Sequence, residues 1–497
     1  MTTTTQTILA NFVDISQHEI YPAQVSFVGG AISSVSKIAD SSEDENLHYI
    51  MPGFIDAHVH IESSMLVPAV FARAAVVHGT VATVSDPHEI ANVLGKQGVD
   101  YMIENGKLVN FKFNFGAPSC VPATPFETAG AALSAAEVDQ LLSREEVLYL
   151  AEMMNWPGVL HNDPEVLKKI NSARKYKKPV DGHAPGLMGE QAEKYAAAGI
   201  STDHECFTRQ EALDKLKYGM KIIIREGSAA KNFEALFSLI DEYPDQIMLC
   251  SDDKHPDDLM EGHIDQLAAR AVSKGMNVFN VLKAACINPI NHYKLNVGQL
   301  RIGDPADFII VKDLSKFQVL QTYINGALVA ENGISKIPYL KSEIVNNFNC
   351  TPKHPRDFKI SAKNKSKIKV IVPEDGQLVT TEQIEEARIE NGFVTSNLAA
   401  DTLKITVINR YSDAPPAVAF IKNFGLQKGA IASCVGHDSH NIIAVGVEDE
   451  SISHIVNQII FHKGGVGAFN GKTDVILPLP IAGIMSELDA REVASKY

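Results

Sequence analysis

Two histidines lie one residue apart at the end of an apolar stretch, in the segment PGFIDAHVHIESS that runs from Pro52 to Ser64. Side chains at positions i and i+2 of a β-strand point to the same side, so His58 and His60 would face the same way. A single buried histidine is usually a core residue with satisfied hydrogen bonds. A pair at a strand end is a stronger indication of a metal site, because neutral imidazole is a common metal ligand.

Other residues of ligand type follow a series of apolar runs between residues 49 and 253. In chain order they are Asp86, His88 and Glu89; Glu152; Asp181 and His183; Asp203, His204 and Glu205; Arg225 and Glu226; and Asp252 and Asp253. Burying so many polar groups at one end of one domain would be costly without a cation. Helix caps and strand-end ion pairs are the alternative, and they would account for single residues but not for the whole set.

The chemistry of these residues favours a transition metal. Imidazole and carboxylate ligands together suit Zn, Mn or Fe better than Ca or Mg. The set is large enough for two ions, with three residues on one, two on the other and one shared: His58, His60 and Asp252; His183 and His204; and Glu152. Hydroxide held between two such ions is a nucleophile at neutral pH, so we expect hydrolytic attack on a carbonyl or an amidine-like carbon.

The elements that would position these residues follow from the alternation of apolar runs with helix-like stretches. Strands that alternate with helices form parallel sheets. Eight such units in about 250 residues predict a TIM-type (β/α)8 barrel over residues 51–296. Active sites of these barrels lie at the carboxyl ends of the strands, which is where the ligand-type residues fall.

The segments that flank the barrel have the character of short strands and turns. Gly29-Gly30 and Asn325-Gly326 each separate two apolar runs, as in β-hairpins. We expect residues 1–50 and 297–345 to form one small β domain and residues 346–367 to be a linker. Further strands and one amphipathic helix predict a C-terminal α+β domain over residues 368–497. The predicted fold class is therefore α/β.

Composition limits the classes of partner. The 497-residue chain has a formal net charge of -15 at pH 7, which argues against a broad nucleic-acid or anionic-membrane surface. No apolar stretch is long enough to span a membrane, and no secretory signal is evident at the N-terminus. The six cysteines are scattered, so we expect a reduced, cytoplasmic protein. The apolar stretch LPLPIAGIMS predicts a buried or an interface segment, and we expect a homo-oligomer.

Several stretches resemble the amidohydrolase superfamily and, within it, the deaminases that act on adenine. The shared features are H-x-H on the first strand, histidines after the fifth and sixth strands, and aspartate after the eighth. DPHEI and IREGSAA are the most specific stretches, and others are DGHAPGL, CSDDKHP and, in the last domain, FGLQKGAIASCVGHDSHNI. The resemblance runs over residues 51–485, which is nearly the whole chain.

The resemblance implies a barrel that hydrolyses adenine to hypoxanthine and ammonia with two divalent ions, Mn or Fe, with Zn as a further option. Hydroxide activated by the metals would attack C6, a carboxylate would take its proton, and an acid would protonate N1 and the leaving amine. Asp252 is the candidate base. Glu152 is either a bridging ligand or the N1 acid, and His204 is the third candidate catalytic residue.

Further residues have less specific expected roles. Four could hold an auxiliary metal or orient the ligands: Asp86, His88, Glu89 and Asp253. Three would line the pocket for the purine: Arg225, Glu226 and Ser228. A structural Arg–Glu pair is the alternative for these three. His437 and His440, in the stretch VGHDSHN, would close over the site or contact the purine, unless they belong to an ordinary polar turn.

Three alternatives to adenine hydrolysis remain open. A cyclic-amide hydrolase of the same superfamily usually bridges its metals with a carboxylated lysine after the fourth strand, where this chain has Glu152 and no lysine. A deaminase for another aminopurine or an adenine-containing nucleoside would differ in pocket shape. A non-catalytic barrel should lack several ligands, whereas this chain has all of them.

Overall fold

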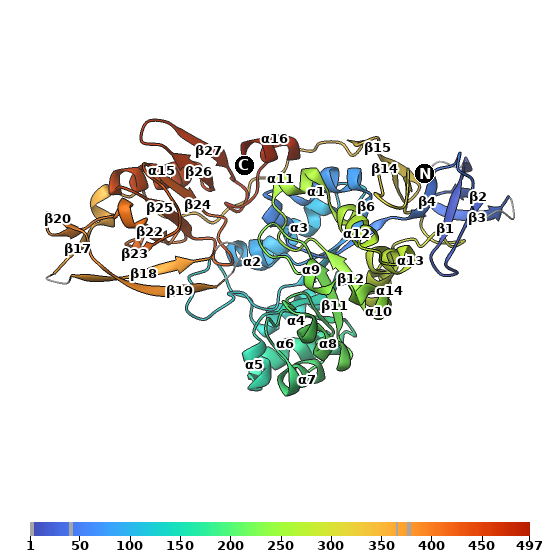
Figure 1. Ribbon diagram of the computed structural model, residues 1–497, viewed down its shortest axis with the longest axis horizontal. Coiled ribbons are helices and arrows are strands. Elements are labelled where there is room, and N and C mark those ends of the chain that lie inside the picture. The colour runs from blue at the N-terminus through green and yellow to red at the C-terminus, as the bar shows by residue number, and fades with distance from the viewer. Residues whose placement is uncertain (1–3, 39–42, 364–365, 375–378) are drawn as a thin grey trace. The chain divides into compact units, whose positions relative to one another are not determined.

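The computed structural model describes residues 4–38, 43–363, 366–374 and 379–497 (Figure 1). The chain divides into two compact units. The first comprises Met1–Pro87, Val99–Cys120 and Leu133–Leu340, and the second comprises His88–Gly98, Val121–Ala132 and Lys341–Tyr497. Within the described residues, no helix is both long and apolar enough to cross a membrane.

Eight strands of the first unit coincide with the apolar runs, and every pair among them is parallel. Five form one sheet in chain order: β5 (Phe54–Val59), β6 (Thr80–Ser85), β7 (Lys112–Ala117), β8 (Val147–Met153) and β9 (Val180–Gly182). Three form a second sheet: β10 (Thr202–Asp203), β11 (Lys221–Arg225) and β12 (Ile247–Cys250). All residues of β5 and β6 are buried, as expected for strands covered on both faces.

Backbone hydrogen bonds link the two parallel sheets at both ends. Ser201 N, just before β10, donates to Val180 O of β9 (2.8 Å). At the other end, Asp252 N donates to His58 O of β5 (2.9 Å), and His60 N donates to Asp252 O (3.3 Å). The carboxyl ends of β5 and β12 are therefore held side by side, and this brings the residues that follow each strand together.

Helices alternate with these strands in the first unit. They are α1 (Pro68–Ala75), α3 (Lys96–Gly106, with residues 99–106 in this unit), α4 (Ala135–Leu142), α5 (Trp156–Leu160), α6 (Pro164–Lys175), α7 (Gly189–Ala197), α8 (Arg209–Lys217), α9 (Phe233–Leu236), α10 (Leu239–Glu242), α11 (Pro256–Glu261), α12 (Ile264–Ser273), α13 (Val278–Leu282) and α14 (Asn288–Tyr293). Asp163 illustrates how they begin, since its side chain accepts from the backbone N–H groups of Glu165 and Val166 and Pro164 opens α6.

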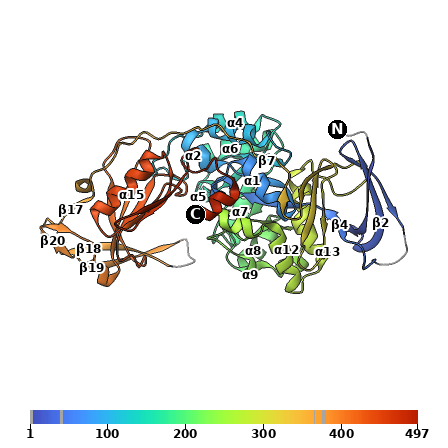
Figure 2. The ribbon, with the colours of Figure 1, turned by 90° about the horizontal axis from the view of Figure 1, so that it is seen from above.

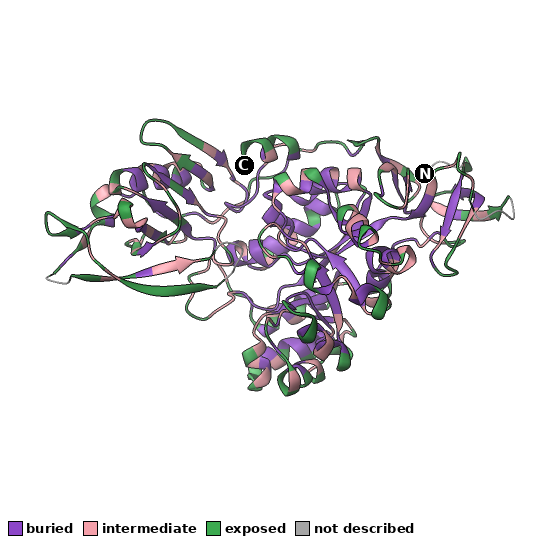
Figure 3. Ribbon diagram, viewed as in Figure 1, coloured by how far each residue is buried: buried purple, intermediate pink, exposed green. Residues whose placement is uncertain are grey.

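An apolar core cluster holds several of these helices, among them α8, α9, α10, α12 and α13, on strands β11 and β12. Ile222 and Ile224 of β11 and Leu249 of β12 pack in one cluster with Leu267 and Ala271 of α12. Full burial of each Ile or Leu contributes about 1.5–3 kcal/mol. Figure 3 shows the strands of this core as buried.

The first unit also contains an eight-stranded sheet whose strands come from two segments, residues 6–52 and residues 308–335. Its order is β16-β15-β14-β13-β4-β1-β2-β3. The strands are β1 (Gln6–Asp14), β2 (Glu19–Val28), β3 (Ala31–Lys37), β4 (Tyr49–Pro52), β13 (Phe308–Val311), β14 (Val319–Ile324), β15 (Ala327–Glu331) and β16 (Ile334–Ser335). Both predicted hairpin turns are confirmed: Gly29-Gly30 joins β2 to β3, and Asn325-Gly326 joins β14 to β15. All four turn residues have positive φ, which these short turns require.

The second unit contains another eight-stranded sheet, in the order β19-β18-β23-β22-β25-β24-β26-β27. Its strands are β18 (Lys367–Pro373), β19 (Thr380–Glu386), β22 (Leu403–Ile408), β23 (Ala417–Ile421), β24 (Ala430–Ser433), β25 (Ile442–Gly446), β26 (Gly465–Phe469) and β27 (Asp474–Pro478). Short strands β17 (Ile360–Ser361), β20 (Ile389–Glu390) and β21 (Phe393–Val394) form a small sheet of their own.

Among its described residues the second unit also has three α-helices: α2 (His88–Leu94), α15 (Asp449–Phe461) and α16 (Ala490–Lys496). The amphipathic segment expected to be helical forms α15, which lies on β24, β25 and β26 (Figure 2). Ile452, Ile455 and Ile459 of α15 are buried in one apolar cluster with strand residues Ala432 and Ala444.

Candidate metal centre

The structure brings six of the expected ligands together within the first unit. They come from or directly follow five parallel strands: His58 and His60 at the end of β5, Glu152 in β8, His183 after β9, His204 after β10, and Asp252 after β12. All except His183 are buried. Because parallel strands place their carboxyl ends at one edge, residues nearly 200 positions apart in sequence meet there.

Glu152 lies at the middle of this group. Its Oε2 is 2.8 Å from Nδ1 of His183 and 3.1 Å from Nε2 of His204. Its Oε1 is 3.5 Å from Nε2 of His60, and Oε2 is 3.9 Å from Nε2 of His58. One carboxylate therefore faces four imidazoles from three strand ends, β5, β9 and β10, which is an arrangement suited to a metal ligand.

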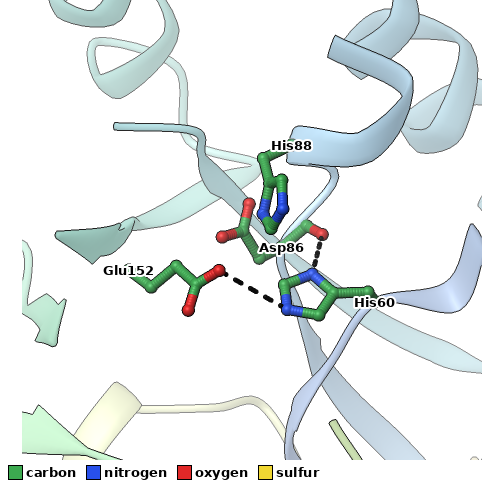
Figure 4. Close-up of side chains that lie close together, drawn as sticks. All are labelled: His60, Asp86, His88 and Glu152. Carbon is green, nitrogen blue, oxygen red and sulfur yellow. Dashed lines mark hydrogen bonds and ion pairs between the residues drawn. The ribbon is translucent and has the colours of Figure 1, made fainter. Parts of the chain in front are cut away.

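The orientation of His60 leaves one of its nitrogens facing acceptors. Its Nδ1 donates to the backbone oxygen of Asp86 (3.1 Å), so Nε2 carries a lone pair (Figure 4). That Nε2 lies 3.4 Å from Oδ1 of Asp252, 3.5 Å from Oε1 of Glu152 and 3.2 Å from Nε2 of His58. Lone pairs that converge on one point are typical of ligands around a cation.

Two imidazole nitrogens in this group have no hydrogen-bond partner. Nδ1 of His58 and Nδ1 of His204 are both buried without one, and the two rings stack with centroids 4.1 Å apart. A buried unpaired nitrogen is costly. Histidine, aspartate and glutamate together also form the donor set that Zn, Mn and Fe prefer. The residues present therefore fit a metal centre.

The electrostatics keep two of the ligands, His58 and Glu152, in the forms that bind a metal. Burial lowers the pKa of His58 well below its usual range, so this imidazole is neutral. Burial alone would raise the pKa of Glu152, but His183, His204 and His60 hold it well below the usual value. Burial alone would lower the pKa of His183, but the negative charges of Glu152 and Glu205 outweigh this effect and raise it to about 9. A bound metal would displace that proton.

Arg225 lies beside the centre and contacts two carboxylates. Its Nη1 donates to Oδ2 of Asp252 (2.6 Å), and its guanidinium pairs with Glu205 through both terminal nitrogens. Burial alone would raise the pKa of Asp252, but His60, Arg225 and His204 hold it well below the usual value. Arg225 therefore fixes one oxygen of Asp252 and leaves Oδ1 facing the histidines.

The other first-unit residues, expected either to line a purine pocket (Glu226, Ser228) or to hold an auxiliary metal or orient the ligands (Asp86, Asp253), contact partners of their own. Glu226 accepts from Nη1 of Arg270 (2.6 Å), and Ser228 donates to Oδ2 of Asp258 (2.5 Å). Asp253 accepts from the hydroxyl of Ser63 (2.7 Å). Asp86 contributes the backbone oxygen that orients His60. The structure thus places the side chains of Glu226, Ser228 and Asp253 in local polar pairs.

Four expected residues belong to the second unit. His88 and Glu89 begin α2, whereas His437 and His440 lie in the loop between β24 and β25. Within that unit the structure brings all four together: Glu89 forms ion pairs with His437 and His440, and His88 lies 3.6 Å from Oε1 of Glu89.

One supporting network had no role assigned from the sequence. Asp56 accepts from Ser251 N (3.0 Å), from the Ser251 hydroxyl, and from Nε2 of His263 (2.8 Å). The hydroxyl of Thr80 then donates to Nδ1 of His263 (2.7 Å). This buried chain ties β5 to β12 and so holds the first and last ligands in place. The position of Asp56, two residues before His58, is the signal that could have pointed to it.

Comparisons with known proteins agree with this geometry. The model of the amidohydrolase family matches residues 49–329, and the model of the adenine deaminase C-terminal domain matches residues 377–497. The adenine deaminase of Borreliella burgdorferi is 53% identical over 497 residues, covering 99% of this chain and 90% of the relative. The adenine deaminase of Salinibacter ruber is 52% identical over 491 residues, covering 99% and 89%.

A solved structure shows the same fold at low sequence similarity. The N-acetylglucosamine-6-phosphate deacetylase of Pasteurella multocida aligns with a TM-score of 0.50 at 12% identity, over 65% of this chain and 100% of that chain. Fold, ligand set and family model all define a metal-dependent α/β hydrolase. The chain belongs to the amidohydrolase family and, within it, to the adenine deaminases.

Proposed function

We propose that this protein hydrolyses adenine to hypoxanthine and ammonia at the candidate metal centre. The observation that carries the proposal is the convergence of six ligand residues on one point of the first unit, in a chain 53% identical to a curated adenine deaminase. The chemical balance is simple: adenine and water give hypoxanthine and ammonia. Water supplies the oxygen at C6, one proton for the departing amine and one for the purine ring.

The ligand residues would hold two divalent cations, Mn or Fe, with Zn as a further option. The division of the six follows the contacts, with three residues on one ion, two on the other and one between them: His58, His60 and Asp252; His183 and His204; and Glu152. When bound, such a pair supplies Lewis-acid chemistry that makes water a nucleophile at neutral pH.

Asp252 is suited to move a proton. It is ionised, Arg225 fixes its Oδ2, and its Oδ1 lies within 3.7 Å of Nε2 of both His58 and His60. An oxygen held at that point can take a proton from attacking water and return it to the leaving amine. Glu152 is held ionised by three imidazoles, which favours the bridging role over that of an N1 acid. His204, whose ring stacks on that of His58, would help to position the substrate at the centre.

The closure of the barrel, the domain boundaries, the oligomeric state and the cellular compartment are part of the same proposal. The parallel strand order and the backbone bonds that link the two sheets at both ends support a closed (β/α)8 barrel. We retain the expected domain boundaries, with a C-terminal α+β domain over residues 368–497. A homo-oligomer in the cytoplasm is also proposed, and six buried cysteines with no disulfide among the described residues support the reducing compartment.

Isotope incorporation tests the reaction directly. Manganese-loaded protein is incubated with adenine in H2(18)O, and the products are analysed by mass spectrometry with an assay for ammonia. The proposal predicts hypoxanthine that carries one heavy oxygen, and ammonia in equal amount. Adenosine, guanine and a cyclic amide serve as comparison substrates. Turnover of any of these at a rate above that of adenine would replace the proposed substrate.

A further inference from the structure

The second unit contains a compact group of side chains of metal-ligand type that are not among the six ligands of the candidate metal centre. Two of them, His88 and Glu89, open α2, and three come from the loop between β24 and β25, about 350 positions later in the chain. This second-unit cluster consists of His88, Glu89, His437, Asp438 and His440. All five residues belong to the same compact unit.

Contacts within the second-unit cluster converge on the Glu89 carboxylate. Its Oε1 lies against Nδ1 of His437 and its Oε2 against Nε2 of His440. Nε2 of His88 is 3.6 Å from Oε1 of Glu89 and 3.1 Å from Oδ1 of Asp438. One ligand atom from each of His88, Glu89 and Asp438 lies within 4.8 Å of the other two. Three imidazoles and two carboxylates therefore surround one small volume.

The most buried members of the cluster contact one another as ion pairs and have no hydrogen-bond partner from outside the cluster among the described residues. His440 and Glu89 are each 1% exposed. Both ring nitrogens of His440 are buried without a hydrogen bond, and so are both oxygens of Glu89. Groups of this kind are costly to bury unless something satisfies them. Because Nε2 of His440 and Oε2 of Glu89 point at each other, one bound cation would satisfy both.

A third carboxylate adds negative charge at the same place. Glu127 comes from the 121–132 segment of the second unit, and its Oε2 is buried without a hydrogen bond. Burial, followed by the negative charges of Asp438 and Glu89, raises the pKa of Glu127. Glu127, Asp438 and Glu89 thus repel one another electrostatically, and a dication would relieve this repulsion.

The backbone that carries the cluster is held in place by other hydrogen bonds. Asn441 Nδ2 donates to Thr128 O (2.8 Å), and the Tyr411 hydroxyl donates to Ser439 O (2.6 Å). At the other side, Asn92 Nδ2 donates to His88 O (3.0 Å). Ligands that are fixed in advance lose little entropy when an ion binds. The side chains of His437 (42% exposed) and Asp438 (19% exposed) leave a path for entry.

We propose a further binding site for a divalent transition-metal ion in the second unit, formed by five side chains: His88, Glu89, His437, Asp438 and His440. Imidazole-rich sets of this kind select Zn, Mn or Fe over Ca or Mg. The bound ion would cross-link the start of α2 to the β24–β25 loop. This site goes beyond the proposed adenine hydrolysis and does not depend on it.

The test counts ions in a full-length chain whose first-unit centre is disabled by His58→Ala and His183→Ala. Zn²⁺ binding to this chain is measured by equilibrium dialysis and mass spectrometry of the metal, with Mn²⁺ as a second probe. Adding Glu89→Gln and His440→Ala should remove one ion per chain or weaken its binding at least about tenfold. The readout is the difference between the two chains, so it holds even if the first-unit ligands are assigned incorrectly, and it involves no adenine.

His454→Ala is the matched control. Nε2 of His454 pairs with Oδ2 of Asp474 (2.7 Å) in the same unit, on the exposed side of α15, and contacts no second carboxylate among the described ion pairs. Its removal should leave the Zn²⁺ count unchanged. An equal count in the chains with and without Glu89→Gln and His440→Ala would overturn the proposed site.

A second measurement leaves the cluster intact and so does not depend on whether its variants fold. Hydrogen exchange is followed in residues 88–94 and 435–441 of the chain with the disabled first-unit centre, with and without Zn²⁺. Binding should slow exchange in both segments at least about tenfold, because the ion holds them together. Unchanged exchange in both segments at saturating Zn²⁺ would contradict the site.

Discussion

Replacing Arg225 by methionine tests the role assigned to the ion pairs beside the metal centre. The substitution keeps much of the apolar volume of the side chain but removes the cation between Asp252 and Glu205. All three side chains are at most 4% exposed. Breaking a buried charge network from one side costs about 3–5 kcal/mol, because the remaining charges stay buried and unpaired. Asp252 also loses the contact that fixes Oδ2.

The expected result is a loss of about 3–5 kcal/mol in the free energy of unfolding, measured with urea on metal-free protein. The kcat for adenine should fall about 100-fold in the metal-loaded enzyme, since Asp252 is no longer held in position. Activity and stability should therefore both decrease, with the metal still bound by the six ligands.

Arg270→Met is the control for this substitution. Arg270 also pairs with two carboxylates, Glu226 and Glu234, but its side chain is 35% exposed and that of Glu234 is 59% exposed. Exposed pairs of this kind contribute about 0–1 kcal/mol. If Arg225→Met destabilised the protein no more than Arg270→Met, the buried network would not hold Asp252 in the way described.

Three further predictions address the ligands and their support. The pKa of His183 is raised to about 9, so the folded metal-free protein binds this proton more tightly than the unfolded chain does. Its free energy of unfolding should therefore be highest below about pH 6.5 and fall by up to about 3 kcal/mol as the pH rises through 9. Urea unfolding across this pH range measures the effect, and Glu152→Gln should flatten the dependence. His58→Ala should lower the number of bound ions and abolish turnover, as measured by metal analysis and by adenine consumption. A variant with a normal ion content and a normal rate would show that His58 is not a ligand. Asp56→Asn should cost about 1.5–3 kcal/mol of unfolding free energy because it breaks the buried contacts with Ser251 and His263. As a control, Asp257→Asn on the exposed start of α11 should cost less than about 0.5 kcal/mol in urea unfolding.

Much of the fold could be predicted because its signals are local. Each apolar run between residues 49 and 253 forms a strand, and the turns at Gly29-Gly30 and Asn325-Gly326 form where positive φ is needed. Ligand-type residues at the strand ends could be predicted to meet because parallel strands share one edge. The grouping of His58, His60 and Asp252 follows from that rule alone.

Partner choice among polar side chains could not be predicted in the same way. Arg225 was expected at a purine pocket or in a structural Arg–Glu pair, and its guanidinium contacts Asp252 and Glu205, neither of which the sequence indicated as its partner. No spacing rule indicates which carboxylate a long side chain will reach, because this depends on three-dimensional placement. The same holds for Glu89 with His437 and His440, which lie about 350 positions apart and come together only through the packing of the second unit.

The measurement that tests the central claim most directly is adenine conversion before and after metal removal. Ultraviolet absorbance is followed for manganese-loaded protein, for the same protein stripped with a chelator, and for stripped protein reloaded with manganese. The six-ligand centre predicts conversion to hypoxanthine in the first sample, none in the second, and recovery in the third. Undiminished conversion by the stripped protein, or no conversion of adenine by protein that retains its bound metal, would contradict the account.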